Sequence, residues 1–249
     1  MSPLPEQLID RWRDGYGAAD PAKGTLYWHI LLGNNSPFRN IVLAAQDRLS
    51  GFSGLHMTPL QWLHITVLIA GPAGHISSQA ISEMLETAQL SISDIGPIEV
   101  EFSRVIYHAE GIVLAAHPFE VLSPIREAAQ TATRAVMGHD GLSERSSPIW
   151  TPHVTLCYST SIQPAGPIIG ALGKNLPRCR VAIEGFDLVI QRGSEWLWNW
   201  SSVGAVSITG QLDLQTINAS RIFDSFLSPH NPISYGRCRP RRPGTARPW

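Results

Sequence analysis

Charged residues and cysteines are both scarce in this chain. Asp, Glu, Lys and Arg make up 16% of the 249 residues and the formal net charge is −1, so the overall charge favours no strongly charged partner. The three cysteines show no Cys-x-x-Cys spacing, which argues against a disulfide framework or a zinc ribbon. No apolar run approaches the roughly 18 residues of a membrane span, and the N-terminus lacks the layout of a signal peptide. We therefore expect a reduced, cytoplasmic protein without a membrane partner.

The charge that is present is unevenly distributed. From residue 209 onward six arginines stand against two aspartates, so this tail carries +4 and residues 1–208 carry −5 of the total of −1. A net-acidic body disfavours an extended grip on a long nucleic acid, but a small nucleotide or a terminal phosphate stays open. We expect an N-terminal extension over 1–24, a folded domain over 25–208 and a disordered basic Pro/Arg-rich tail over 209–249. The tail is also a candidate for nonspecific RNA binding.

Apolar periodicity predicts strands that alternate with helices. A strand with Tyr27 and His29 on one face is expected over residues 26–32, and a hairpin with its turn at Glu110-Gly111 over 98–118. Further expected elements are helices over 37–51, 76–92, 119–138 and 166–175, and strand segments over 180–192 and 196–208. This order predicts an α/β or α+β sheet with helices packed outside.

Two apolar strand segments each carry a histidine and a threonine two positions apart. The letters are His64-Ile65-Thr66-Val67 in the first and His153-Val154-Thr155-Leu156 in the second. Because strand side chains alternate, each His–Thr pair points to one face and the aliphatic residues to the other. A helix, a connection and then such a strand occur in both halves of the chain, which indicates an internal duplication.

These motifs and the approach "GLHMTPLQWLHIT" resemble the 2H phosphoesterases, in particular the 2'-5' RNA ligase-like and cyclic phosphodiesterase group, over about residues 25–208. The resemblance implies an α+β fold with two pseudo-symmetric lobes of antiparallel-rich sheet, outer helices and an active-site cleft between the lobes. It implies catalytic roles for His64 and His153 and phosphate binding by Thr66 and Thr155, with no metal and no cofactor.

Two imidazoles suit the opening of a 2',3'-cyclic phosphate. With an ordinary pKa near 6.5, one can take a proton from water while the other gives one to the leaving ribose oxygen; which does which is left open. We expect a monomeric hydrolase of cyclic phosphates on RNA ends or nucleotides, with 2'-5' RNA ligation as the reverse side activity. One alternative is a non-catalytic nucleotide or RNA-end binding module. Another is a metal-dependent hydrolase, for which the sequence offers no third ligand.

Several further side chains are weaker candidates. Tyr27 and His29 are expected to stack on or hydrogen-bond a base, with an ordinary sheet-face role as the alternative. Tyr158 is expected on the strand face opposite His153, in the core. The stretch "WLWNW" over residues 196–200 is either an aromatic platform for a base or part of a core face. The other histidines fit no ligand spacing and are expected on the surface or in turns: His56, His75, His108, His117, His139 and His230.

Overall fold

The computed structural model describes residues 4–13, 24–74, 76–142, 150–192 and 195–208. Several predictions lie outside the described residues. They concern most of the N-terminal extension, the positions of His75 and His230, and the whole tail 209–249. No helix in these ranges is both long and apolar enough to cross a membrane.

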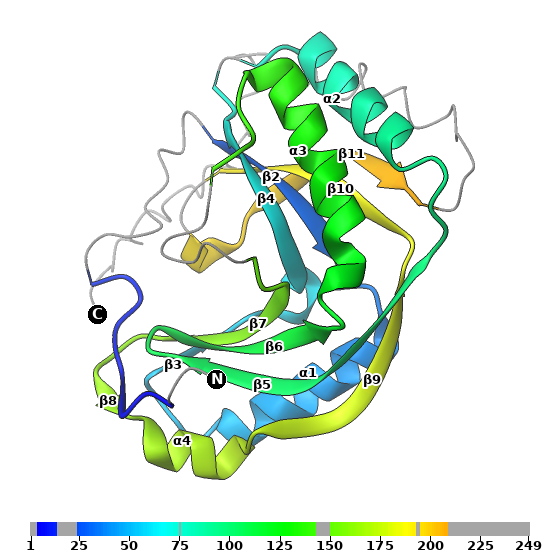
Figure 1. The fold of residues 1–249 in the computed structure, drawn as a ribbon. Helices are drawn as coiled ribbons and strands as arrows, with labels where there is room; N and C mark the ends of the chain where they lie inside the picture. The colour runs from blue at the N-terminus through cyan, green and yellow to red at the C-terminus, as the bar shows by residue number, and fades with distance from the viewer. Residues whose placement is uncertain (1–3, 14–23, 75, 143–149, 193–194, 209–249) are drawn as a thin grey trace, which may run out of the picture.

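A large antiparallel sheet forms the centre of the molecule (Figure 1). Among the described residues it has nine strands, ordered β11-β10-β2-β4-β7-β6-β5-β9, with β3 paired to β7. Their bounds are β2 Thr25–Leu31, β3 Leu55–Met57, β4 His64–Pro72, β5 Ile98–His108, β6 Gly111–His117, β7 His153–Ser159, β9 Asn175–Ile183, β10 Gly185–Gln191 and β11 Trp200–Ser207. The predicted α+β class is confirmed, because helices pack outside a sheet whose neighbouring strands are all antiparallel.

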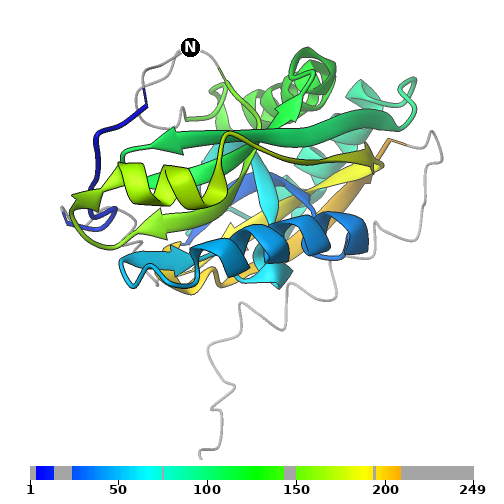
Figure 2. The same cartoon turned by 90° about the horizontal axis from the view of Figure 1, so that it is seen from below.

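The sheet divides into two lobes at its centre. Strands β4 and β7 are paired at one position, Ile65 with Val154. Helices α2 (Ser78–Ser91) and α3 (Ser123–Met137) cover the β4 lobe, and α1 (Ser36–Leu49) and α4 (Ala165–Leu172) cover the β7 lobe. Figure 2 views the molecule from the end that α1 and α4 cover. Each lobe thus takes its helices from both halves of the chain. Helix α1 precedes the first motif but covers the lobe of the second, and α3 precedes the second motif but covers the lobe of the first.

Helix α1 illustrates why these segments fold locally. The side chain of Asn35 accepts a hydrogen bond from the backbone N–H of Phe38 (3.0 Å), and Pro37 stands in the first turn, where its missing N–H costs nothing. Buried side chains then recur at helical spacing, at Phe38, Val42, Ala45 and Leu49. Burying each of the larger ones stabilises the helix on the sheet by about 1.5–3 kcal/mol.

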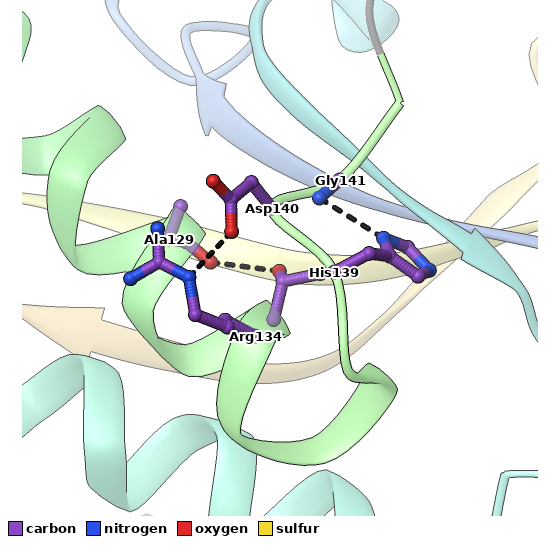
Figure 3. Close-up of polar contacts among 6 residues, drawn as sticks. Ala129, Arg134, His139, Asp140 and Gly141 are labelled. Atoms are coloured by element: carbon purple, nitrogen blue, oxygen red, sulfur yellow. Dashed lines mark hydrogen bonds and ion pairs between the residues drawn. The ribbon is translucent and has the colours of Figure 1, made fainter.

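Helix α3 ends as the sequence predicts. Gly138 takes a left-handed conformation (φ 76°), which glycine adopts without strain. The following turn is held by an ion pair from Arg134 to Asp140 (2.5 Å) and by a hydrogen bond from the Gly141 N–H to His139 Nδ1 (3.0 Å), as Figure 3 shows. The turn then leads back to β4, where Leu142 N–H donates to the carbonyl of Ile69 (2.8 Å).

One predicted strand segment is in fact two strands. The apolar pattern over 180–192 is interrupted at Glu184, where β9 ends and β10 begins. Strand β9 pairs with β5 at one edge of the sheet, whereas β10 pairs with β2 and β11 in the other lobe. The chain therefore crosses between the lobes inside a segment that looks continuous in the sequence.

The described part of the N-terminal segment is docked on the β7 lobe. Gln7–Leu8 (β1) pairs with Gln163–Pro164 (β8), and Leu8 is completely buried in the main core. Arg11 N–H donates to the carbonyl of Ser159 (3.0 Å), and the Arg11 guanidinium forms an ion pair with Glu110 (2.6 Å). This docking brings the next residue, Trp12, against the end of β7.

Candidate active site

The two motifs meet at the centre of the sheet. Ile65 and Val154 are paired and completely buried, so the register of this antiparallel pair places His64 opposite Thr155 and His153 opposite Thr66. All four side chains lie on the face away from the buried aliphatic residues. The structure therefore brings together the four residues that the sequence singled out, with each histidine facing the threonine of the other motif.

Both histidines are oriented by the same hydrogen bond. His64 Nδ1 lies 2.7 Å from the carbonyl oxygen of Trp62, and His153 Nδ1 lies 2.7 Å from that of Thr151. A carbonyl oxygen only accepts, so each Nδ1 carries the hydrogen and donates it. In the neutral ring Nε2 is then unprotonated and directed away from this anchor, as a proton-transferring histidine requires. The two anchors come from the same relative position, two residues before each histidine.

Aromatic rings enclose His64. His29 stacks on it with ring centroids 4.2 Å apart, and Trp200 (4.6 Å) and Trp198 (5.8 Å) meet it edge-on. Burial lowers the pKa of His64 to about 4; the bond to Trp62 opposes this change, and the nearby His153 adds to it. In the ligand-free protein His64 is therefore neutral at pH 7.

Tyr27 and His29 lie on the same sheet face as the motifs, but their side chains differ in solvent exposure. His29 is 1% exposed and lies under His64 and Trp200, and neither of its ring nitrogens has a hydrogen-bond partner among the described residues. Burial, aided by His64, lowers its pKa well below the ordinary value. Tyr27 is half-buried beside it, 5.2 Å away between ring centroids. His29 is thus placed to support the ring of His64 rather than to lie against a base.

The backbone of the first motif is braced from outside the sheet. Trp150 Nε1 donates to the carbonyl of Thr66 (3.0 Å), and the Arg126 guanidinium lies 4.9 Å above the Trp150 ring. The Thr66 side chain is half-buried on the face that carries both motifs, and the Thr155 side chain is 9% exposed. Both hydroxyls can donate to an oxygen atom bound between the motifs.

A further histidine lies beside the second motif. The ring of His108, at the end of β5, is 6.4 Å from that of His153. Burial lowers the pKa of His108, His153 lowers it further, and Glu110 opposes both. The sequence pattern predicted only a surface or turn position for His108, because its proximity to His153 arises from the pairing of β5, β6 and β7 and leaves no spacing signal.

A β-bulge follows each motif threonine. On β4, Thr66 pairs with His29 and Leu68 with Trp28, so Val67 is the extra residue. On β7, Thr155 pairs with Val113 and Cys157 with Ile112, so Leu156 is the extra residue. Bulges are frequent next to active sites, where they redirect side chains. Here the fourth position of both motifs carries one.

The second bulge corrects the prediction for Tyr158. Strict alternation would place this side chain opposite His153, but the extra residue at Leu156 reverses the alternation. Tyr158 instead stacks on Trp198 (5.5 Å, 10° between the planes) in a small cluster of Val189, Trp198 and Trp200, separate from the main core. The tryptophans of "WLWNW" are likewise divided, because Trp198 and Trp200 face the site and Trp196 is 43% exposed.

Metal ligands are not gathered in the described part of the chain, where no group of three or more His, Cys, Asp or Glu side chains is able to hold an ion. Two His-x-Thr strands that meet in one antiparallel sheet agree with the resemblance of the sequence to the 2H phosphoesterases. The 2'-5' RNA ligase superfamily model matches residues 42–195, and the chain belongs to this superfamily.

Solved structures share the fold. TT0787 of Thermus thermophilus superposes with a TM-score of 0.55 at 17% identity, covering 75% of this chain and 99% of the other. Escherichia coli LigT complexed with 3'-AMP gives 0.52 at 12% identity over 75% and 98%. LigT complexed with NADP+ gives 0.51 at 14% identity over 75% and 99%. No curated protein matches the sequence.

Proposed function

We propose that this protein hydrolyses a 2',3'-cyclic phosphate, on an RNA end or a nucleotide, to a 2'-phosphate without a metal ion. The observation that carries the proposal is the pair of identical Nδ1 anchors, which present two Nε2 atoms on one face beside the motif threonines. A nucleotide ligand is supported by the relative LigT, which has been crystallised with 3'-AMP. Ligation would be the same ring opening with an RNA 5'-hydroxyl in place of water as the nucleophile, so that a 2'-5' bond forms as the bond from phosphorus to O3' breaks.

In the proposed reaction the two histidines transfer protons and the two threonines bind the phosphate. A water oxygen attacks phosphorus while one histidine Nε2 takes its proton, and the bond from phosphorus to the ribose O3' breaks as the other Nε2 gives a proton to that oxygen. The hydroxyls of Thr66 and Thr155 donate to the non-bridging oxygens as charge redistributes. His29 is a positioning residue that holds the ring of His64.

His64 starts the cycle in the form that a general base needs, because its pKa is about 4 in the free protein. A bound phosphate changes this balance, since a negative charge nearby favours the protonated ring. The pKa of His64 is therefore higher in the substrate complex than in the free protein. We place the reaction in the cytoplasm, which the free, buried Cys157 and Cys179 support.

The test is hydrolysis of the four nucleoside 2',3'-cyclic phosphates in excess EDTA, with 2'- and 3'-phosphate products resolved. We expect turnover in the wild type and its loss in His64→Ala and in His153→Ala. The matched control is His139→Gln, because His139 lies after α3, at the opposite end of β4 from His64. Turnover that needs a metal, or that persists in both alanine variants, would overturn the mechanism. Binding without turnover would favour the non-catalytic binding module.

A further inference from the structure

Aromatic rings from three separate segments meet outside the proposed active site. Trp12 comes from the N-terminal segment, His56 from β3, and Trp196 from the short helix Glu195–Leu197 (η3). Trp196 stacks on His56 (4.0 Å, 14°), and Trp12 meets Trp196 (4.5 Å) and His56 (5.6 Å) edge-on. These three rings are called the aromatic platform below.

The platform is held in place by half-buried Trp12 and His56, and its third ring, Trp196, is open to solvent. The carbonyl of Trp196 lies 3.1 Å from His56 Nε2, which donates to it. Trp196 is 43% exposed and the neighbouring Leu197 62% exposed. Trp198 adopts a left-handed conformation (φ 52°), which is uncommon for a bulky residue and turns Trp198 towards the site while Trp196 stays outside.

The platform is continuous with the site. Trp12 meets the ring of Tyr158 (5.6 Å), Tyr158 stacks on Trp198, and Trp198 meets His64. The guanidinium of Arg11, which is paired with Glu110, lies 4.9 Å above the Tyr158 ring on this path. The platform is thus three ring-to-ring steps from His64, beyond the rings that enclose the catalytic histidine.

We propose that the aromatic platform stacks the base of the penultimate nucleotide of an RNA, the one on the 5' side of the nucleotide that carries the 2',3'-cyclic phosphate. The natural substrate is then a single-stranded RNA end rather than a free cyclic nucleotide; this inference rests on the proposed function. Every base has a π face, so stacking on an aromatic side chain tolerates any sequence, and its loss typically costs about 5- to 150-fold in affinity. Trp12 and Trp196 lie outside residues 42–195, which the superfamily model matches.

The experiment compares kcat/KM for a cyclic mononucleotide and for a short single-stranded RNA ending in a 2',3'-cyclic phosphate. We expect Trp196→Leu to lower kcat/KM on the RNA by about 5- to 150-fold and to leave the mononucleotide unchanged. Trp196→Phe, which keeps a ring, should retain most of the RNA activity. Leu90→Ala is the matched control, since Leu90 is 69% exposed on α2.

Equal kinetics of wild type and Trp196→Leu on the RNA would overturn the platform while leaving the proposed hydrolysis intact. If the wild type hydrolyses neither substrate, the proposed function fails, and the platform is judged by binding alone. Fluorescence anisotropy of a labelled single-stranded RNA with a cyclic end then measures the affinity. A weaker affinity of Trp196→Leu supports the platform, and an unchanged affinity overturns it.

Discussion

Acidification should destabilise this protein through His64. The rings around His64 hold its pKa at about 4, chiefly by burial, whereas an exposed histidine titrates near 6.5. Between these values the unfolded chain binds a proton that the folded protein does not, so the free energy of unfolding falls as the pH drops from 6.5 towards 4. The difference between the two pKa values corresponds to about 3 kcal/mol.

Urea unfolding of the wild type and His64→Gln at pH 7 and at pH 4 measures this contribution. We expect the wild type to lose about 3 kcal/mol more than the variant between these pH values, because glutamine does not titrate. Asp187 titrates in both proteins and cancels, whereas His29 is coupled to His64, so the difference between the two losses measures His64 together with its effect on His29. Equal losses would refute the reasoning, because His64 would then titrate at the same pH in the folded and unfolded chain.

Three further predictions test individual contacts. Thr66→Val and Thr155→Val should each lower kcat by about 10²- to 10³-fold, because each removes one donor to the phosphate. An unchanged melting temperature by circular dichroism would show that the fold of each variant is intact. A phosphodiester with a 4-nitrophenolate leaving group needs no protonation on departure, so it should restore turnover only to the histidine variant that lacks the general acid. Thr133→Val should cost about 1–3 kcal/mol in urea unfolding, because the buried Trp28 Nε1 donates to Thr133 Oγ1 (3.1 Å) and would lose its acceptor. A Trp28→Phe, Thr133→Val double variant should then show no further loss from the threonine change.

Local periodicity predicted most of the elements and the motif face. The helices over 37–51, 76–92 and 119–138 and the hairpin over 98–118 correspond to α1, α2, α3 and β5–β6. These patterns are set by neighbours a few residues apart, which the sequence displays directly. The same holds for the His-x-Thr strands, where alternation alone puts His and Thr on one face.

What the sequence could not show depends on pairing between distant strands. The bulges at Val67 and Leu156 exist only relative to β2 and β6, so alternation placed Tyr158 on the wrong face. The approach of Trp200 to His64 requires β10 and β11 to pair on the outer side of β2. No spacing in the chain records such contacts, and for this reason the enclosure of His64 was not predicted.

The enclosure of His64 makes the site a late product of protein synthesis. A ribosome completes both motifs well before it reaches Trp200, and among the strands of residues 4–208 that the structure describes, β11 is the last to emerge. Until β11 pairs with β10, the ring of His64 lacks Trp200 and stays closer to water, where histidine titrates near 6.5. A chain released before residue 200 would therefore contain both motifs without the environment that keeps His64 neutral. The order of translation would therefore determine when His64 acquires its lowered pKa.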